Sequence, residues 1–136
     1  MIEVKNVVKT FDGFRALDDL TMTVPHGAVY GLVGPNGAGK STTLNTIAGL
    51  LRSKTGSIEF MGQSLAKVPS HKIVAKGLAL VPEGRRVFLQ MTVQENLEMG
   101  AFTQKNAGIA QDLEMVYDLF PRLKERLKQK IGRAHV

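Results

Sequence analysis

The 136-residue sequence contains no cysteine and no tryptophan. Without cysteine, neither a disulfide framework nor a metal site built on thiolates can form. Aromatic residues make up only 6% of the chain, too few for the stacking platform that single-stranded nucleic acids need. No apolar run approaches the roughly 18 residues of a membrane-spanning helix, and residues 1–6 lack the apolar stretch of a signal peptide. This composition is typical of a soluble intracellular protein with one modest domain.

The net charge of +6 does not indicate a nucleic-acid partner. Lysine and arginine are scattered along most of the chain, and Glu125 interrupts the densest basic segment, residues 122–133. A nucleic-acid interface usually gathers its basic residues on one face and adds aromatic ones. We therefore expect no nucleic-acid binding.

The last seven residues, 130–136, read KIGRAHV and look foreign to the rest of the chain. They back-translate into a common sequencing-adapter sequence, so we interpret them as a suspected non-native tail and exclude them from reasoning about the fold. Without Lys130 and Arg133, 16 basic residues stand against 12 acidic ones, and the net charge falls to +4.

Residues 34–41 carry the richest chemical signal in the sequence. They read GPNGAGKS and fill every fixed position of the pattern G-x-x-x-x-G-K-[ST]. The apolar run 28–33 precedes them, and the helix-compatible residues 40–51 follow. A strand that ends in a glycine-rich turn and opens a helix directs several backbone N–H groups, and the positive end of the helix dipole, at one place. The sequence therefore predicts a nucleoside triphosphate site.

Each residue type in this loop has a predicted role. Gly34, Gly37 and Gly39 lack the Cβ atom that would block a left-handed turn or keep the backbone away from phosphate. Lys40 offers a positive charge to the β- and γ-phosphates, and the Ser41 hydroxyl can ligate Mg²⁺. ATP and Mg²⁺ are the expected cofactors. The nucleotide-binding set predicted for the loop is Gly34, Pro35, Asn36, Gly37, Ala38, Gly39, Lys40, Ser41 and Thr42.

Hydrophobic periodicity predicts five strands. Two segments alternate apolar and polar residues as half-buried strands do, with a turn at Asp12-Gly13 between them. Glycines bound a third segment. Two more are apolar throughout, which is typical of strands buried on both faces of a parallel sheet. The predicted strands are, in order, residues 2–8, 20–24, 28–33, 56–62 and 78–81.

The helix predictions rest on capping and stop signals. Thr92 and Glu95 have the spacing of a capping box, and Gly100 closes the helix that they open. Ser70 is the expected N-cap of a short helix, and Pro121 ends an amphipathic one. The predicted helices are residues 40–51, 69–76, 92–99 and 110–120.

The order of these segments resembles the ATP-binding subunits of ABC transporters. Residues 81–88, VPEGRRVF, followed by residues 91–97, MTVQENL, are similar to the branched-chain amino-acid importer ATPases (LivF-type), and FPRLKER at 120–126 strengthens the match. The resemblance implies an α/β fold, a P-loop NTPase of the ABC type. Its parts would be a parallel core sheet with flanking helices and an N-terminal antiparallel β subdomain. Residues 1–129 would form the N-terminal part of one ATPase domain.

The sequence departs from this family in what it lacks. The family's signature motif L-S-G-G-Q, its apolar strand ending in Asp-Glu and its switch histidine do not occur in the 136 residues. The resemblance therefore implies an N-terminal fragment, truncated in the helical subdomain. It would hold nucleotide-binding residues without the machinery for turnover. We expect ATPase activity of the complete protein and none of this fragment alone.

The resemblance assigns roles to residues outside the loop. Phe11 aligns with the aromatic residue that stacks on adenine, although packing within a small antiparallel sheet explains it equally well. Glu83 stands at the position of the glutamine that reaches Mg²⁺ and the attacking water, and a carboxylate is a suitable ligand; its alternative role is to cap the turn after Pro82. Arg85 and Arg86 are either docking residues for membrane subunits or solvated surface charge.

The family suggests a function and partners. The protein would be the ATP-binding subunit of an importer of branched-chain amino acids, peripheral on the cytoplasmic face of the plasma membrane. Its partners would be transmembrane permease subunits, a second ATPase subunit and, indirectly, an external amino-acid-binding protein. Two alternatives are the ATPase of a lipopolysaccharide-export transporter, in which glutamine would be expected at Glu83, and a nucleotide-binding module without turnover.

Overall fold

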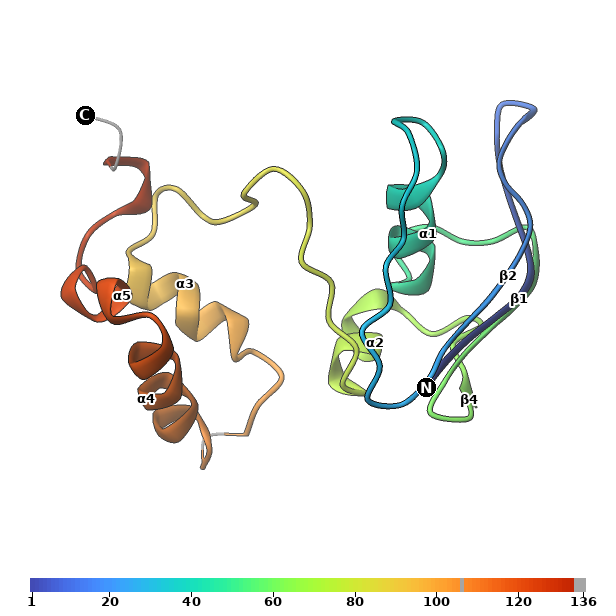
Figure 1. Cartoon of the computed structure of the whole chain (residues 1–136). Helices are drawn as coiled ribbons and strands as arrows, with labels where there is room; N and C mark the ends of the chain where they lie inside the picture. The colour runs from blue at the N-terminus through green and yellow to red at the C-terminus, as the bar shows by residue number, and fades with distance from the viewer. Residues whose placement is uncertain (106, 134–136) are drawn as a thin grey trace. The chain divides into compact units, whose positions relative to one another are not determined.

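A computed structural model describes residues 1–105 and 107–133 of the chain. It divides into an N-terminal unit, Met1–Val81, and a C-terminal unit, Pro82–Val136 (Figure 1). No helix among the described residues is long and apolar enough to cross a membrane.

An antiparallel sheet of four strands forms the base of the N-terminal unit. Its strands lie in the order β2-β1-β3-β4, and every neighbouring pair is antiparallel. Asp12 and Gly13 have φ angles of 45° and 82°, which suits the two-residue turn that joins twisted strands. This sheet confirms the predicted N-terminal β subdomain. The strands are β1 (Ile2–Phe11), β2 (Phe14–Val24), β3 (Thr55–Phe60) and β4 (Gln63–Ser64).

The hydrophobic core of this unit joins the sheet to two short helices, α1 (Lys40–Ile47) and α2 (Ser70–Ala75). Val4 and Val7 of β1 and Ile73 of α2 are almost completely buried. Burying such a side chain contributes about 1.5–3 kcal/mol, so these contacts hold the helices on the sheet. The other core members are Leu17, Ile47, Ile58 and Leu65.

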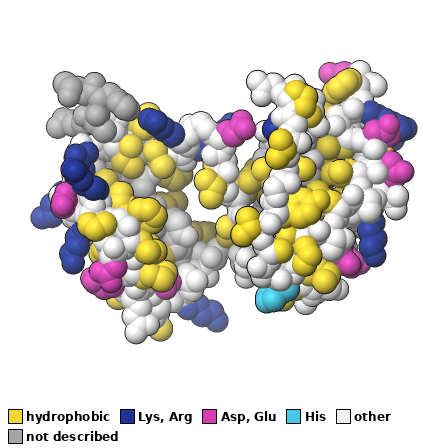
Figure 2. Space-filling view, viewed as in Figure 1, with side chains coloured by type: hydrophobic (Ala, Val, Ile, Leu, Met, Phe, Trp, Pro, Cys, Tyr) yellow, Lys and Arg dark blue, Asp and Glu magenta, His cyan; other side chains and the backbone are white. Residues whose placement is uncertain are grey.

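Two predicted strands are wrong in this structure. Residues 28–33 and 78–81 belong to no strand, and Val29, Val33 and Val81 expose 103%, 94% and 91% of their reference surface. A parallel strand exists only through hydrogen bonds to neighbours in the sheet, and no described segment pairs with either run. The described residues thus form no parallel sheet. Figure 2 shows hydrophobic side chains gathered on the visible surface of this unit.

The helices of the N-terminal unit are shorter than predicted, α1 at its end and α2 at both ends. α1 ends at Ile47 instead of residue 51, because Gly49 has a φ angle of +79° that no helix accommodates. The N-cap of α2 is Pro69 rather than Ser70, and no side chain caps this helix. Pro69 has the extended backbone of an N-cap residue, and Ser70 is already the first helical residue.

The C-terminal unit contains the helices α3 (Val93–Gly100), α4 (Ile109–Leu119) and α5 (Pro121–Glu125) and a short 3₁₀ helix, Ile131–Arg133. The capping box is confirmed: the Glu95 N–H donates to Thr92 Oγ1 at 3.2 Å, and the Thr92 N–H donates to Glu95 Oε2 at 2.7 Å. Pro121 ends α4 as predicted and opens α5, because proline fits the first position of a helix.

Residues 130–133 fold back along the start of α3. Lys130 forms an antiparallel bridge with Thr92, and the Gly132 N–H donates to the Leu89 carbonyl oxygen at 2.9 Å. Residues 134–136 of the suspected tail, with His135, lie outside the described residues. The non-native origin of residues 130–136 stays a prediction.

Candidate functional site

The glycine-rich loop enters α1 through two left-handed residues. Gly37 and Gly39 have φ angles of +85° and +89°, and Gly39 is the N-cap of α1. At Gly34 the backbone is not left-handed, but a Cβ atom on it would lie 3.1 Å from the Cβ of Ala38, a tight contact. Gly37 and Gly39 thus have the left-handed conformation that their positions in the motif predicted, whereas the constraint at Gly34 is one of packing.

The loop is also held against β2, a contact that the motif does not reveal. A Cβ atom on Gly39 would lie 2.8 Å from the Ala16 carbonyl oxygen and 3.1 Å from Leu17 Cδ2. Such a distance to backbone is shorter than a Cβ atom tolerates, so only glycine fits. In contrast, a Cβ atom on Gly37 would meet nothing within 4 Å. The need for glycine at Gly37 thus comes from its left-handed backbone and not from crowding.

Lys40, the first residue of α1, folds its side chain back along the loop. Its Nζ donates to the carbonyl oxygens of Gly34 and Pro35, the latter at 2.8 Å. These bonds place the ammonium group over the same turn that carries the loop's backbone N–H groups. The loop therefore combines a full positive charge with backbone donors, the two elements of a phosphate site.

The start of α1 strengthens the positive potential of this site. The first turn of any helix leaves backbone N–H groups without intrahelical acceptors, and these carry the positive end of the dipole. No acidic residue lies in the first turn of α1 to neutralise it. Thr43 is buried and its hydroxyl donates to the Gly39 carbonyl oxygen at 2.8 Å, which ties the helix to the turn.

The predicted Mg²⁺ ligands lie in different units. Ser41 is the second residue of α1 and is exposed. Glu83 belongs to the C-terminal unit, where it is exposed and its carbonyl oxygen accepts from Arg86 Nε at 3.3 Å. A hydroxyl and a carboxylate are both hard oxygen ligands that suit Mg²⁺. The metal roles of both residues stay predictions.

Phe11 lies at the end of β1, beside the turn of the β1–β2 hairpin, where it pairs with Phe14. It is 42% exposed, so it does not belong to the core of the sheet. The Lys9 ammonium nitrogen lies 5.0 Å from the centre of its ring. In Figure 1 the hairpin turn and the glycine-rich loop lie at the same end of the N-terminal unit. The adenine role of Phe11 stays a prediction.

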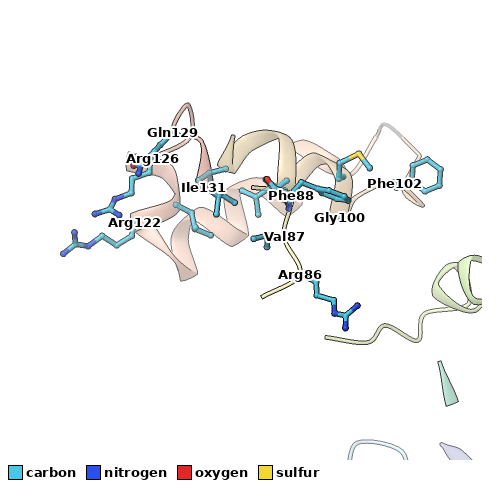
Figure 3. Close-up of a pocket in the computed structure, with 14 residues that line it drawn as sticks. Arg86, Val87, Phe88, Gly100, Phe102, Arg122, Arg126, Gln129 and Ile131 are labelled. Carbon is cyan, nitrogen blue, oxygen red and sulfur yellow. Dashed lines mark hydrogen bonds between the residues drawn. The ribbon is translucent and has the colours of Figure 1, made fainter. Parts of the chain in front are cut away.

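Sequence reasoning did not anticipate an apolar groove in the C-terminal unit, with a volume of about 770 Å³ (Figure 3). Asn96 of α3 fixes one side of it: the Phe88 N–H donates to Asn96 Oδ1 at 2.8 Å, and Asn96 Nδ2 donates to the Phe88 carbonyl oxygen at 3.0 Å. No residue of α3 is buried, although the helix is amphipathic. The groove's lining includes Val87, Val93, Leu97, Leu123 and Ile131, with Arg86, Arg122 and Arg126.

The chain is similar in sequence to known ATP-binding proteins of transporters. The family model described as ABC transporter matches residues 17–133. The chain is 42% identical to the high-affinity branched-chain amino acid transport ATP-binding protein BraG of Pseudomonas aeruginosa, over 97% of the chain and 57% of the relative. It is 32% identical to the probable branched-chain amino acid transport ATP-binding protein LivF of Archaeoglobus fulgidus, over 92% of the chain and 54% of the relative.

A third relative belongs to a different transport system. The lipopolysaccharide export system ATP-binding protein LptB of Haemophilus influenzae is 28% identical over 98% of the chain and 56% of its own length. The chain thus spans little more than half the length of these curated relatives.

Solved structures share the fold. The ATP-binding subunit of an ABC transporter superposes with a TM-score of 0.83 at 31% identity, over 99% of this chain and 55% of that one. An ATP-binding cassette in its ADP conformation gives 0.74 at 26% identity, over 97% and 57%. A dimeric bacterial cassette gives 0.71 at 25% identity, over 79% and 50%.

Proposed function

The chain belongs to the ABC transporter family, and on that premise we propose that the complete protein is the ATP-binding subunit of an importer of branched-chain amino acids. It would couple ATP binding and hydrolysis to uptake. The observation that carries this proposal is the left-handed glycine loop, with Lys40 at the start of α1. The 42% identity to a branched-chain amino-acid relative supports the choice of substrate.

The residues of the loop would contact different parts of ATP. Backbone N–H groups of residues 36–42 would surround the phosphates, and Lys40 would neutralise part of their charge. Catalysis of phosphoryl transfer depends mostly on positioning the phosphates and stabilising their charge, and these contacts would do both. Ser41 and Glu83 would hold Mg²⁺, which supplies further charge neutralisation when bound. Phe11 would stack on the adenine ring.

The partners follow from the same proposal. Transmembrane permease subunits would form the pore, and a second ATPase subunit would complete each nucleotide site. An external amino-acid-binding protein would act on the permease and only indirectly on this subunit. The exposed Arg85 and Arg86 would contribute to docking on the permease, and the protein would lie at the cytoplasmic face of the plasma membrane.

Residues 1–136 alone should release phosphate from ATP only at background rate, because they lack the family's signature motif and its Asp-Glu strand. A lipopolysaccharide-export ATPase is a second candidate, favoured by the 28% identity to a lipopolysaccharide export ATP-binding protein. The carboxylate at Glu83, where that type is expected to carry glutamine, argues for the importer.

Replacement of Lys40 tests the nucleotide site. In the full-length protein, Lys40→Ala should remove most of the affinity for a fluorescent ATP analogue, since a charge-assisted contact at the centre of the site is lost. Lys5→Ala, which removes an exposed charge from β1, is the matched control and should bind as the wild type does. Equilibrium titration measures both. An affinity of Lys40→Ala within a factor of two of the wild type would contradict the assignment.

Substrate choice needs a separate experiment in cells. A strain that carries Lys40→Ala should lose uptake of labelled leucine, isoleucine and valine and keep uptake of an unrelated amino acid. Normal leucine uptake with a defect in lipopolysaccharide export would favour the second candidate instead.

A further inference from the structure

The ammonium group of Lys9 is held at two points that lie far apart in the sequence. Its Nζ lies 5.0 Å from the centre of the Phe11 ring and donates to the Arg52 carbonyl oxygen at 2.8 Å. Arg52 belongs to the segment between α1 and β3. Among the described residues, Lys9 forms no ion pair. The charge is therefore directed at an aromatic face and a carbonyl oxygen.

The backbone by itself fixes Phe11 weakly. The pairing of β1 with β2 changes register between Lys9 and Thr10, so the strand is irregular immediately before Phe11. The ring is 42% exposed and its partner Phe14 is 66% exposed, which means that no core packing surrounds them. A side chain placed so has several rotamers available. A cation within 6 Å of the ring centre favours one of them.

We propose that Lys9 is a positioning residue for the nucleotide base. It holds the Phe11 ring through a cation–π contact, with Arg52 as its anchor, so that the ring offers a fixed face for stacking. This inference rests on the proposed function, specifically on the adenine role of Phe11. The anchor at Arg52 distinguishes this arrangement from a freely moving surface lysine, because it fixes the position of the charge.

The test compares binding of a base with binding of phosphate alone. In the full-length protein, Lys9→Met should weaken binding of a fluorescent ATP analogue about two- to fivefold, as expected for a partly exposed cation–π contact. Affinity for magnesium tripolyphosphate, which has no base, should not change. Lys9→Arg, which keeps a cation and a donor, should bind ATP like the wild type. Lys5→Met, the same charge change on the same strand, is the control and should leave both affinities unchanged.

A double-mutant cycle links the two residues. Phe11→Leu should weaken ATP binding at least fivefold, a typical value for loss of a base stack, and adding Lys9→Met to it should have no further effect. An equal loss for ATP and tripolyphosphate, an undiminished effect in the Phe11→Leu background, or Lys9→Arg behaving like Lys9→Met would each overturn the proposal. So would Phe11→Leu binding like the wild type, with nucleotide binding itself intact. If the wild type binds no ATP analogue, the proposed function fails first.

Discussion

Gly37 and Gly39 belong to the same motif but differ in how closely other residues pack against them. Both have a left-handed backbone, which costs a residue with a Cβ atom about 1–2 kcal/mol. Only Gly39 also packs against β2, where a Cβ atom would lie 2.8 Å from the Ala16 carbonyl oxygen. The two positions therefore separate the conformational need for glycine from the need created by close packing.

The pair gives a prediction at the residue scale. Gly37→Ala should lower the free energy of unfolding by about 1 kcal/mol, through backbone strain alone. Gly39→Ala should lower it by about 2–5 kcal/mol, because overpacking against Ala16 adds to the same strain. Chemical denaturation of the two variants under identical conditions measures both values. Equal destabilisation would show that the contact with β2 has no energetic weight.

The helix α3 is short and has a reciprocal hydrogen-bonded cap at its start. It buries none of its residues, and short helices without tertiary packing are marginal in water. The capping box satisfies backbone donors at its start. The hydrogen bond from the Thr92 backbone N–H, then that from the Thr92 side chain, and the positive charge of Lys130 hold the pKa of Glu95 below its ordinary value.

This lowered pKa predicts a pH dependence. Because the folded pKa of Glu95 lies below the unfolded one, its ionised form stabilises α3 above the unfolded value, and this contribution is lost as pH falls through the folded pKa. Glu95→Gln should therefore be less stable than the wild type near pH 7 and equally stable near pH 3. Urea denaturation at both pH values measures the difference.

Glu98→Gln on the same helix is the matched control. Glu98 accepts a hydrogen bond from Gln94 within the exposed face of α3, away from the cap. Its effect on stability should be the smaller one at pH 7. A difference between Glu95→Gln and the wild type that persists unchanged at pH 3 would contradict the role assigned to the ionised carboxylate.

At the scale of the whole molecule, the N-terminal unit buries only part of its apolar surface. Its core lies between the antiparallel sheet and the helices α1 and α2, whereas the apolar runs 28–33 and 78–81 have no partner strand among the described residues. They line an apolar hollow of about 230 Å³ together with α1. Exposed apolar backbone edges pair readily with other chains.

Residues 1–136 expressed alone should accordingly self-associate. We expect aggregates in size-exclusion chromatography and a broad thermal transition. Replacing Val29, Val33 and Val81 by serine should shift the chain towards monomer, because the exposed apolar surface is reduced. Val74→Ser on α2 is the control and should leave the association unchanged. A soluble wild-type monomer with one sharp transition would overturn this prediction and favour a self-sufficient nucleotide-binding module.

The sequence by itself determined the features that depend on near neighbours. Three such features are present in the structure: the loop at residues 34–41, the turn at Asp12-Gly13 and the capping box of Thr92 and Glu95. Each is built from residues that lie close together in the sequence. The same local signals located parts of β1, β2 and β3 but not β4. β1 and β2 are hairpin partners that follow each other along the chain, whereas β3 pairs with β1 from a distant part of it.

Tertiary structure decided which contacts form between residues that are distant in the sequence. Residues 28–33 and 78–81 have the composition of buried strands, but a strand exists only where a neighbour supplies hydrogen bonds, and composition cannot state that. The close approach of Gly39 to Ala16 and the bond from Lys9 to Arg52 join residues that are 23 and 43 positions apart. Such contacts arise from packing of whole elements, so no local pattern encodes them.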